Sequence, residues 1–217
     1  MVLLLYRVPA RKTNTRLFAK QSSGCYTVMD MSYVIPILLG TVRQGRESEK
    51  VARFVLAQLE AHPDIETALL DVREMELPMD DEGRVLADKN HAYRDAILKA
   101  DGLVIVTPEY NNSYPGSLKR ALDILLPEYR HRAVGVAGVS NGSFGGARAM
   151  WALYPVLRKI GLVAIDKELN FGDVEELFAD DGSIHDPETW EKRVSGFIAE
   201  LLWMSHALRL GREQDKK

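Results

Sequence analysis

The chain has a single cysteine, Cys25, among its 217 residues, so no disulfide can form within it. Its five histidines are scattered, and no Cys/His group has the spacing of metal ligands. These absences argue against a disulfide scaffold and against a metal site. They fit a reducing compartment, and we expect the protein to be cytoplasmic.

The chain also lacks an excess of one charge and a long apolar run. Its 28 basic and 31 acidic residues give a formal net charge of −3, so no overall basic field favours nucleic acid. No segment approaches the roughly 20 apolar residues needed to span a bilayer. We therefore expect neither a nucleic-acid nor a membrane partner, and 46% hydrophobic residues suffice for one packed domain.

The amino-terminal segment, residues 1–31, differs from the rest in having five basic residues but one acid. It has no helical or strand periodicity beyond residues 2–6. Three origins stay open: an upstream start codon before a true start at Met29 or Met31, a cloning-derived extension, or a transit-like peptide. We expect a disordered extension that does not join the core.

From residue 34 onward, short apolar runs alternate with amphipathic segments. Pro36 lies inside the first run and has no amide for a strand ladder, which predicts an interruption there. The alternation predicts an α/β domain over 32–210, followed by a charged tail over 211–217. Its sheet would be doubly wound, parallel and five-stranded, in the order 2-1-3-4-5. The expected strands are 34–39, 65–70, 103–106, 133–139 and 162–165, and the expected helices are 48–62, 87–100, 115–126, 145–160 and 187–208.

The loop after the first strand, residues 40–48, reads GTVRQGRES. Free amides and the positive end of the following helix suit a phosphate there. Thr41 and Ser48 offer hydroxyl donors, and Arg43 can hold two phosphate oxygens. GK[ST] and GxGxxG are both absent, which argues against a Walker loop and a Rossmann dinucleotide site. The alternative is a solvated turn in which Ser48 caps the helix.

A second loop, PEYNNSYPG, follows the strand 103–106. Ligands of open α/β sheets bind at the carboxyl ends of the strands, and this loop offers backbone groups from Pro108 to Asn111 beside the Tyr110 ring. A flat heterocycle with polar edges would suit it. We expect Glu109 to position a ligand through its backbone, or else to be a solvated carboxylate. Tyr114 would either border the ligand or fill an oligomer interface.

A third loop contains GVSNG, residues 138–142, which matches the GxSxG nucleophile turn of serine hydrolases. A strand precedes it and a helix follows, as that turn requires. A serine hydrolase with Ser140 as nucleophile is therefore an alternative, although no HGGG-type oxyanion segment occurs. Candidate triad partners follow in a permitted order: Asp166, Asp173 or Asp180 as the acid, and His185 or His206 as the base.

Together the three loops resemble those of the NAD(P)H-dependent FMN reductase family. Residues 108–123, PEYNNSYPGSLKRALD, resemble its PEYNxSxPGxLKxAxD signature. Residues 38–48 are similar to its phosphate loop, GSxRxxS, with Thr41 in place of serine and about two more residues before Ser48. Residues 139–149 resemble its third flavin loop, SxGxxGGxRA. The matches keep their order across residues 34–163, which is far more specific than any one motif.

The resemblance implies a flavodoxin-like fold, FMN as cofactor, and NADPH or NADH as co-substrate. Reducing equivalents would pass to a small acceptor such as a quinone, an azo compound, chromate or free flavin. It also implies a homodimer or homotetramer. A non-catalytic flavodoxin-like electron carrier is a further alternative. Arg46 and Arg148 would meet either solvent or a 2′-phosphate. No side chain is expected to be catalytic, and the implied cofactor-binding residues are Thr41, Arg43, Ser48, Pro108, Glu109, Tyr110, Asn111, Ser140, Gly142 and Gly145.

Overall fold

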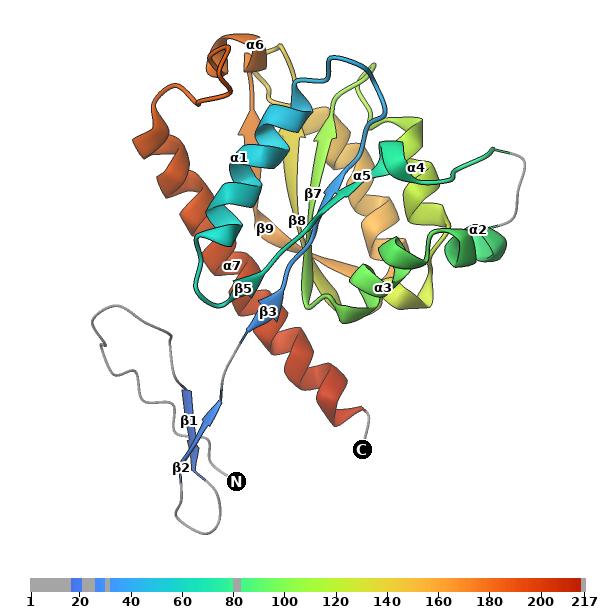
Figure 1. Cartoon of the computed structure of the whole chain (residues 1–217), viewed down its shortest axis with the longest axis vertical. Helices are drawn as coiled ribbons and strands as arrows, with labels where there is room; N and C mark the ends of the chain where they lie inside the picture. Colours follow the sequence, from blue (N-terminus) through green and yellow to red (C-terminus); the bar gives the residue numbers. More distant parts are fainter. Residues whose placement is uncertain (1–16, 21–25, 30–31, 80–82, 216–217) are drawn as a thin grey trace.

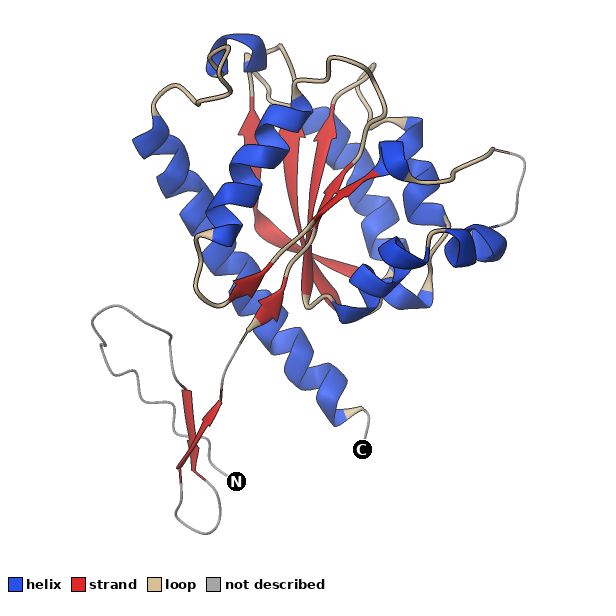
Figure 2. Ribbon diagram, viewed as in Figure 1, coloured by secondary structure: helices blue, strands red, loops and turns tan. Residues whose placement is uncertain are grey.

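A computed structural model of the chain describes residues 17–20, 26–29, 32–79 and 83–215. Its centre is a five-stranded parallel sheet with helices on both faces (Figures 1 and 2). The strand order β6-β4-β7-β8-β9 corresponds to 2-1-3-4-5, so the predicted fold class and topology are confirmed. The strands are β4 (Ile37–Leu39), β6 (Leu69–Asp71), β7 (Gly102–Pro108), β8 (Arg132–Val139) and β9 (Leu162–Phe171).

The first predicted strand is interrupted at Pro36, as expected. Before the break, β3 (Tyr33–Val34) pairs with β5 (Ile65–Glu66) in a separate parallel ladder. After it, β4 joins the main sheet between β6 and β7. Pro36 cannot donate, but its carbonyl still accepts the amide of Val104 at 3.0 Å, which keeps the chain aligned with β7.

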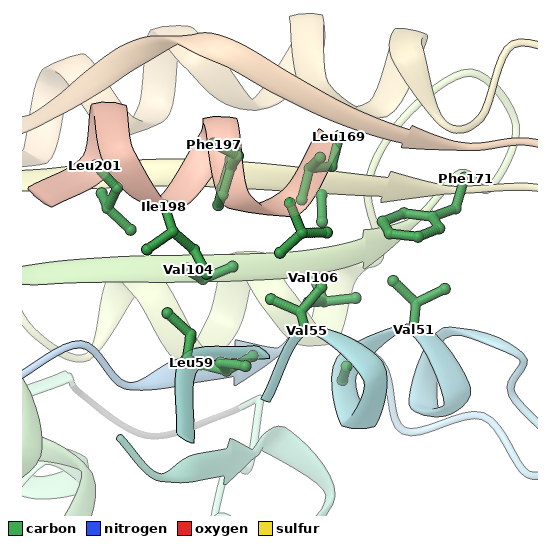
Figure 3. Close-up of a cluster of buried hydrophobic side chains, with 14 of the residues drawn as sticks. Val51, Val55, Leu59, Val104, Val106, Leu169, Phe171, Phe197, Ile198 and Leu201 are labelled. Carbon is green, nitrogen blue, oxygen red and sulfur yellow. The ribbon is translucent and has the colours of Figure 1, made fainter. Parts of the chain in front are cut away.

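Helices α1 (Ser48–Glu60) and α7 (Pro187–Gln214) cover one face of the sheet, and α3 (His91–Lys99), α4 (Gly116–Asp123) and α5 (Ala147–Ile160) cover the other. Figure 3 shows side chains of α1 and α7 meeting those of β7 in the first of two buried clusters. Because both faces are covered, the central strands are apolar throughout, as in β7, where all residues are buried.

Four elements differ from the sequence expectation. The strand expected over 65–70 is divided into β5, which pairs with β3, and β6, which joins the main sheet. The helix expected over 87–100 is divided into α2 (Gly83–Lys89) and α3, because the Asn90 side chain between them bonds to the backbone of Leu86 and Glu76. β9 continues to Phe171 as an edge strand, past a bulge opposite Val134 to Val136. α7 runs to Gln214, beyond the expected end at 208 and into the expected tail.

The smaller elements are the 3-10 turns η1 (Val72–Glu74) and η2 (Pro127–Tyr129), the short helix α6 (Val174–Leu177), and two antiparallel strands, β1 (Leu17–Lys20) and β2 (Tyr26–Met29). The β1–β2 pair is a sheet of its own. The rest of the expected extension over 1–31 lies outside the described residues. Within the described part of the chain, no helix combines the length and apolarity needed to cross a bilayer.

Candidate functional site

The loops that follow β4, β7 and β8 line one cavity of about 330 Å³ at the carboxyl edge of the sheet. This is the edge at which ligands of doubly wound sheets bind. The structure therefore brings together the three loops that the sequence singled out. The residues expected at the site that line this cavity are Arg43, Ser48, Pro108, Glu109, Tyr110 and Ser140.

The amino terminus of α1 opens into this cavity without a cap. Glu47, at the cap position, makes no side-chain capping bond. None of the hydrogen bonds among the described residues uses the backbone amides of residues 44–48. The Ser48 hydroxyl is also without a partner, although Ser48 is only 2% exposed. Donors left unpaired at a helix start bind anions, so this end of the cavity fits a phosphate group.

Thr41 does not line the cavity, and its hydroxyl is engaged within the protein. It shares a hydrogen bond of 3.0 Å with the Tyr110 hydroxyl and accepts the Arg43 amide at 3.3 Å. Thr41 thus joins the first loop to the second. The exposed Arg43 guanidinium lies over the Tyr110 ring, 5.6 Å from its centroid, at the cavity rim.

Arg46 lies neither in solvent nor free for a 2′-phosphate. It is buried, and its guanidinium is paired with the carboxylates of Asp71 and Glu49. This pairing could not be predicted from the sequence, because Asp71 is 25 positions away at the end of β6.

Backbone hydrogen bonds fix the conformation of the second loop. The Glu109 amide donates to the Val139 carbonyl at 2.9 Å, and Tyr110 and Ser113 exchange backbone bonds of 2.8 and 3.0 Å. Asn111, expected at the site, is exposed, has a φ of 50° and does not line the cavity. Tyr114 is half-buried and packs against the second core cluster, and burial raises its pKa.

The Glu109 carboxylate caps the first turn of α5. It accepts the Arg148 backbone amide at 3.1 Å and the Arg148 guanidinium at 3.4 Å. The Arg148 guanidinium also lies over the exposed Phe144 ring, 4.8 Å from its centroid. A carboxylate so engaged stabilises the helix start and is not the solvated group given as the alternative for Glu109.

The Ser140 hydroxyl forms its hydrogen bonds within its own loop. It donates to the Gly142 carbonyl at 2.8 Å and accepts the Gly146 amide at 3.2 Å. Across the described residues, no histidine is bonded to it: His185 bonds to the Glu176 carbonyl and His206 to the Tyr33 hydroxyl. The general base of a serine hydrolase is therefore not in place.

The glycines of the third loop permit packing within the protein. Gly145 has a φ of 56°, and a Cβ there would come within 2.6 Å of the Asn170 backbone. Gly142 is exposed, and neither glycine lines the cavity. The family resemblance implied both as cofactor-binding residues; in the structure Gly145 lets the loop approach the end of β9 closely.

Several further residues line the cavity, among them Val174 and Glu175 of α6, a short helix that the sequence pattern did not predict. The start of α6 is joined to the third loop by the Val174 amide, which donates to the Ser140 carbonyl at 3.3 Å. The Asn141 amide donates to the Glu175 carboxylate at 2.5 Å. Over the residues that the structure describes, no group of acids, histidines or cysteines could hold a metal. The further lining residues are Gln44, Gly45, Arg46, Glu47, Val139, Asn141, Val174 and Glu175.

A doubly wound sheet with this strand order and an uncapped helix start at its carboxyl edge defines a flavodoxin-like protein. The profile of the family described as NADPH-dependent FMN reductase matches residues 34–176. The chain belongs to this family.

Comparisons with individual proteins point to the same family. The chain is 33% identical over 177 residues to a quinone reductase of Escherichia coli (strain K12), covering 76% of this chain and 87% of that one. It is 30% identical over 165 residues to a quinone reductase of Pseudomonas putida (strain KT2440), covering 73% and 88%. The solved structure of the flavoenzyme NAD(P)H:(acceptor) oxidoreductase FerB from Paracoccus denitrificans is 26% identical, with a TM-score of 0.66 over 80% of this chain and 98% of that one.

Family membership makes this chain an oxidoreductase that depends on FMN and takes electrons from NAD(P)H. The free donors at the start of α1 fit the phosphate of that cofactor. FMN, when bound, supplies the redox chemistry, so the absence of an activated side-chain nucleophile at Ser140 is consistent with the class.

Proposed function

We propose that this enzyme transfers reducing equivalents from NAD(P)H through bound FMN to quinones. The observation that carries the placement of FMN is the uncapped start of α1, where residues that line the shared cavity have backbone amides (44–48) and a buried hydroxyl (Ser48) without a partner. A phosphate there would satisfy the Ser48 hydroxyl, which is otherwise buried without a partner at a cost.

In this proposal the chain's residues bind and orient the cofactor. The Ser48 hydroxyl and the loop amides hold the phosphate, and Arg43 adds a cation at the rim. Backbone groups from Pro108 to Tyr110, together with Ser140, border the ring. These groups are polar without being acids or bases, so they fix the position of the ring and leave the redox step to the cofactor.

Quinones are favoured as acceptors because two of the relatives at 30% identity or more are named quinone reductases. A relative named an FMN-dependent NADPH-azoreductase, from Staphylococcus haemolyticus, is 24% identical, which makes azo compounds the second class to test. Chromate and free flavin complete the set of acceptors to be compared.

The test is a spectrum followed by turnover. Purified protein saturated with FMN should show the flavin absorption bands, and oxidation of NADPH or NADH should accelerate on adding 1,4-benzoquinone. Parallel assays with an azo dye, chromate and free FMN rank the acceptors. If benzoquinone gives no acceleration while another acceptor does, the quinone assignment is wrong. If no acceptor accelerates the reaction, the protein is a carrier.

We also propose that the enzyme works in the cytoplasm as a homo-oligomer. Its single cysteine fits a reducing compartment. On α5, Trp151 is 65% exposed and Phe144 just before the helix is 64% exposed, a pair of large apolar side chains suited to contact with a second copy. Light scattering after gel filtration tests this, and Trp151→Arg should shift the mass toward the monomer.

A further inference from the structure

Arg46 has no hydrogen-bond donor left for a ligand. A guanidinium has five N–H donors. In Arg46, Nη1 donates to Asp71 at 2.8 Å and to the Thr41 carbonyl, Nη2 donates to Asp71 and to Glu49 at 3.3 Å, and Nε donates to Glu49 at 3.4 Å. All five donors are used inside the protein, and two carboxylates are paired with the single positive charge.

Asp71 connects this arginine to a second one. The Asp71 carboxylate also accepts the Arg73 backbone amide at 2.9 Å, at the start of η1. The Arg73 guanidinium then reaches back and donates to the Arg43 carbonyl at 2.5 Å. Burial acts to raise the pKa of Asp71, but the bonds from Arg46 and Arg73 outweigh it and leave that pKa below its usual value.

The two arginines engage the carbonyl oxygens of the phosphate loop. Arg46 holds the carbonyl of Thr41, and Arg73 holds that of Arg43. A carbonyl oxygen beside an anion would repel it, so these bonds occupy two carbonyl oxygens of the loop while the backbone amides of residues 44–48 stay without a partner.

We propose that Asp71 and Arg73 set the shape of the phosphate loop from the end of β6. Together with Arg46 they form what we call the strap. Within it Arg46 is a positioning residue and not a phosphate ligand. The proposal rests on the placement of the FMN phosphate at α1 proposed above. It assigns the selectivity for FMN over riboflavin in part to residues that touch neither flavin.

The experiment measures dissociation constants of FMN and riboflavin by fluorescence quenching, together with the melting temperature of the apoprotein. Asp71→Asn should weaken FMN binding by about tenfold or more, the fold-change for loss of a charge-assisted hydrogen bond, and riboflavin binding by less than about twofold. Arg73→Met, a change at an exposed side chain, should act in the same direction with little effect on melting. Arg73→Lys should regain most of the FMN affinity.

Arg53→Met is the matched control. Arg53 is exposed and pairs with the same Glu49, but it makes no contact with the phosphate loop. It should leave both flavin affinities unchanged.

Three results would overturn the proposal. If Asp71→Asn binds FMN as tightly as the wild type or more tightly, the released Arg46 serves as a phosphate ligand. If Asp71→Asn and Arg73→Met weaken FMN and riboflavin equally, the strap supports the fold alone. Ser48→Ala, measured in parallel, separates the two proposals. If Ser48→Ala discriminates between the flavins and both strap variants do not, only the strap is wrong. If none of the three discriminates, the phosphate placement is wrong as well.

Discussion

Replacing Ser48 with alanine should weaken FMN binding and raise the stability of the apoprotein. The Ser48 side chain is buried at the start of α1 and has no hydrogen-bond partner. The apoprotein therefore carries a desolvated hydroxyl that gains nothing from the fold. Bound FMN would supply the missing acceptor, so one substitution acts in opposite directions on the two states.

The magnitudes follow from the two environments. A hydrogen bond to a charged group contributes roughly 1.5–3 kcal/mol, so FMN affinity should fall about 10- to 150-fold. Riboflavin has no phosphate and should be affected less than about twofold. Burying an unpaired hydroxyl costs about 1–3 kcal/mol in protein variants. The apoprotein should therefore melt higher by at least about 2–4 °C, the shift expected for 1 kcal/mol at this chain length.

Titration of both flavins and thermal melting of the apoprotein provide the assay, with Ser205→Ala as matched control. The Ser205 hydroxyl is the other buried serine group without a partner in the described part of the chain, and it lies on α7 against Gly102. Its removal should raise the melting temperature and leave both flavin affinities unchanged. Equal affinity of Ser48→Ala and wild type for FMN would refute the phosphate site at α1.

Four further outcomes are expected. Arg43→Ala should weaken FMN binding by about tenfold and riboflavin binding much less, because Arg43 supplies a charge at the cavity rim; titration within about twofold of wild type would exclude it as an anchor. Ser140→Ala should keep most NAD(P)H-dependent reduction and melt lower, because its hydroxyl only closes its loop; ester cleavage lost in this variant would favour the hydrolase. Burial raises the pKa of Tyr93 and Tyr129 above the ordinary value of about 10. The free energy of unfolding should therefore decline as the pH rises above about 10, where these tyrosines ionise more readily in the unfolded chain. Tyr93→Phe should make this decline shallower in melting curves measured at alkaline pH. A chain starting at Met31 should fold and bind FMN like the full chain; a melting temperature many degrees lower at saturating FMN would contradict this.

The sequence predicted the sheet well because each central strand is an apolar run between turn signals, a pattern that needs no knowledge of neighbours. It missed the second half of β9 because residues 166–168 are charged and exposed there. An edge strand pairs through its backbone on one side only, so its side chains need not be apolar. The extension of α7 depends on bonds from Arg209 and Arg212 to the buried Asp101, more than 100 positions away.

The location of the site could be predicted from the sequence, but the roles of its side chains could not. Loops at the carboxyl edge could be located because strand order alone brings them together. The roles of individual side chains could not, because each depends on a partner distant in sequence. Arg46 reads as a solvated loop cation until Asp71 is placed beside it, and Thr41 reads as a phosphate donor until the Tyr110 hydroxyl is found at its side chain.

The free donors at α1 also couple cofactor binding to stability. A ligand that binds only the folded state stabilises it by RT ln(1 + [L]/Kd), which is about 2.7 kcal/mol at a hundredfold excess over Kd. Because the buried, unpaired Ser48 hydroxyl lowers the stability of the apoprotein, part of that gain should come from the phosphate end of FMN. FMN should therefore raise the melting temperature of the wild type more than riboflavin does at equal concentration. This difference should shrink in Ser48→Ala and persist in Ser205→Ala. Equal stabilisation of the wild type by both flavins would mean that the phosphate does not occupy these donors.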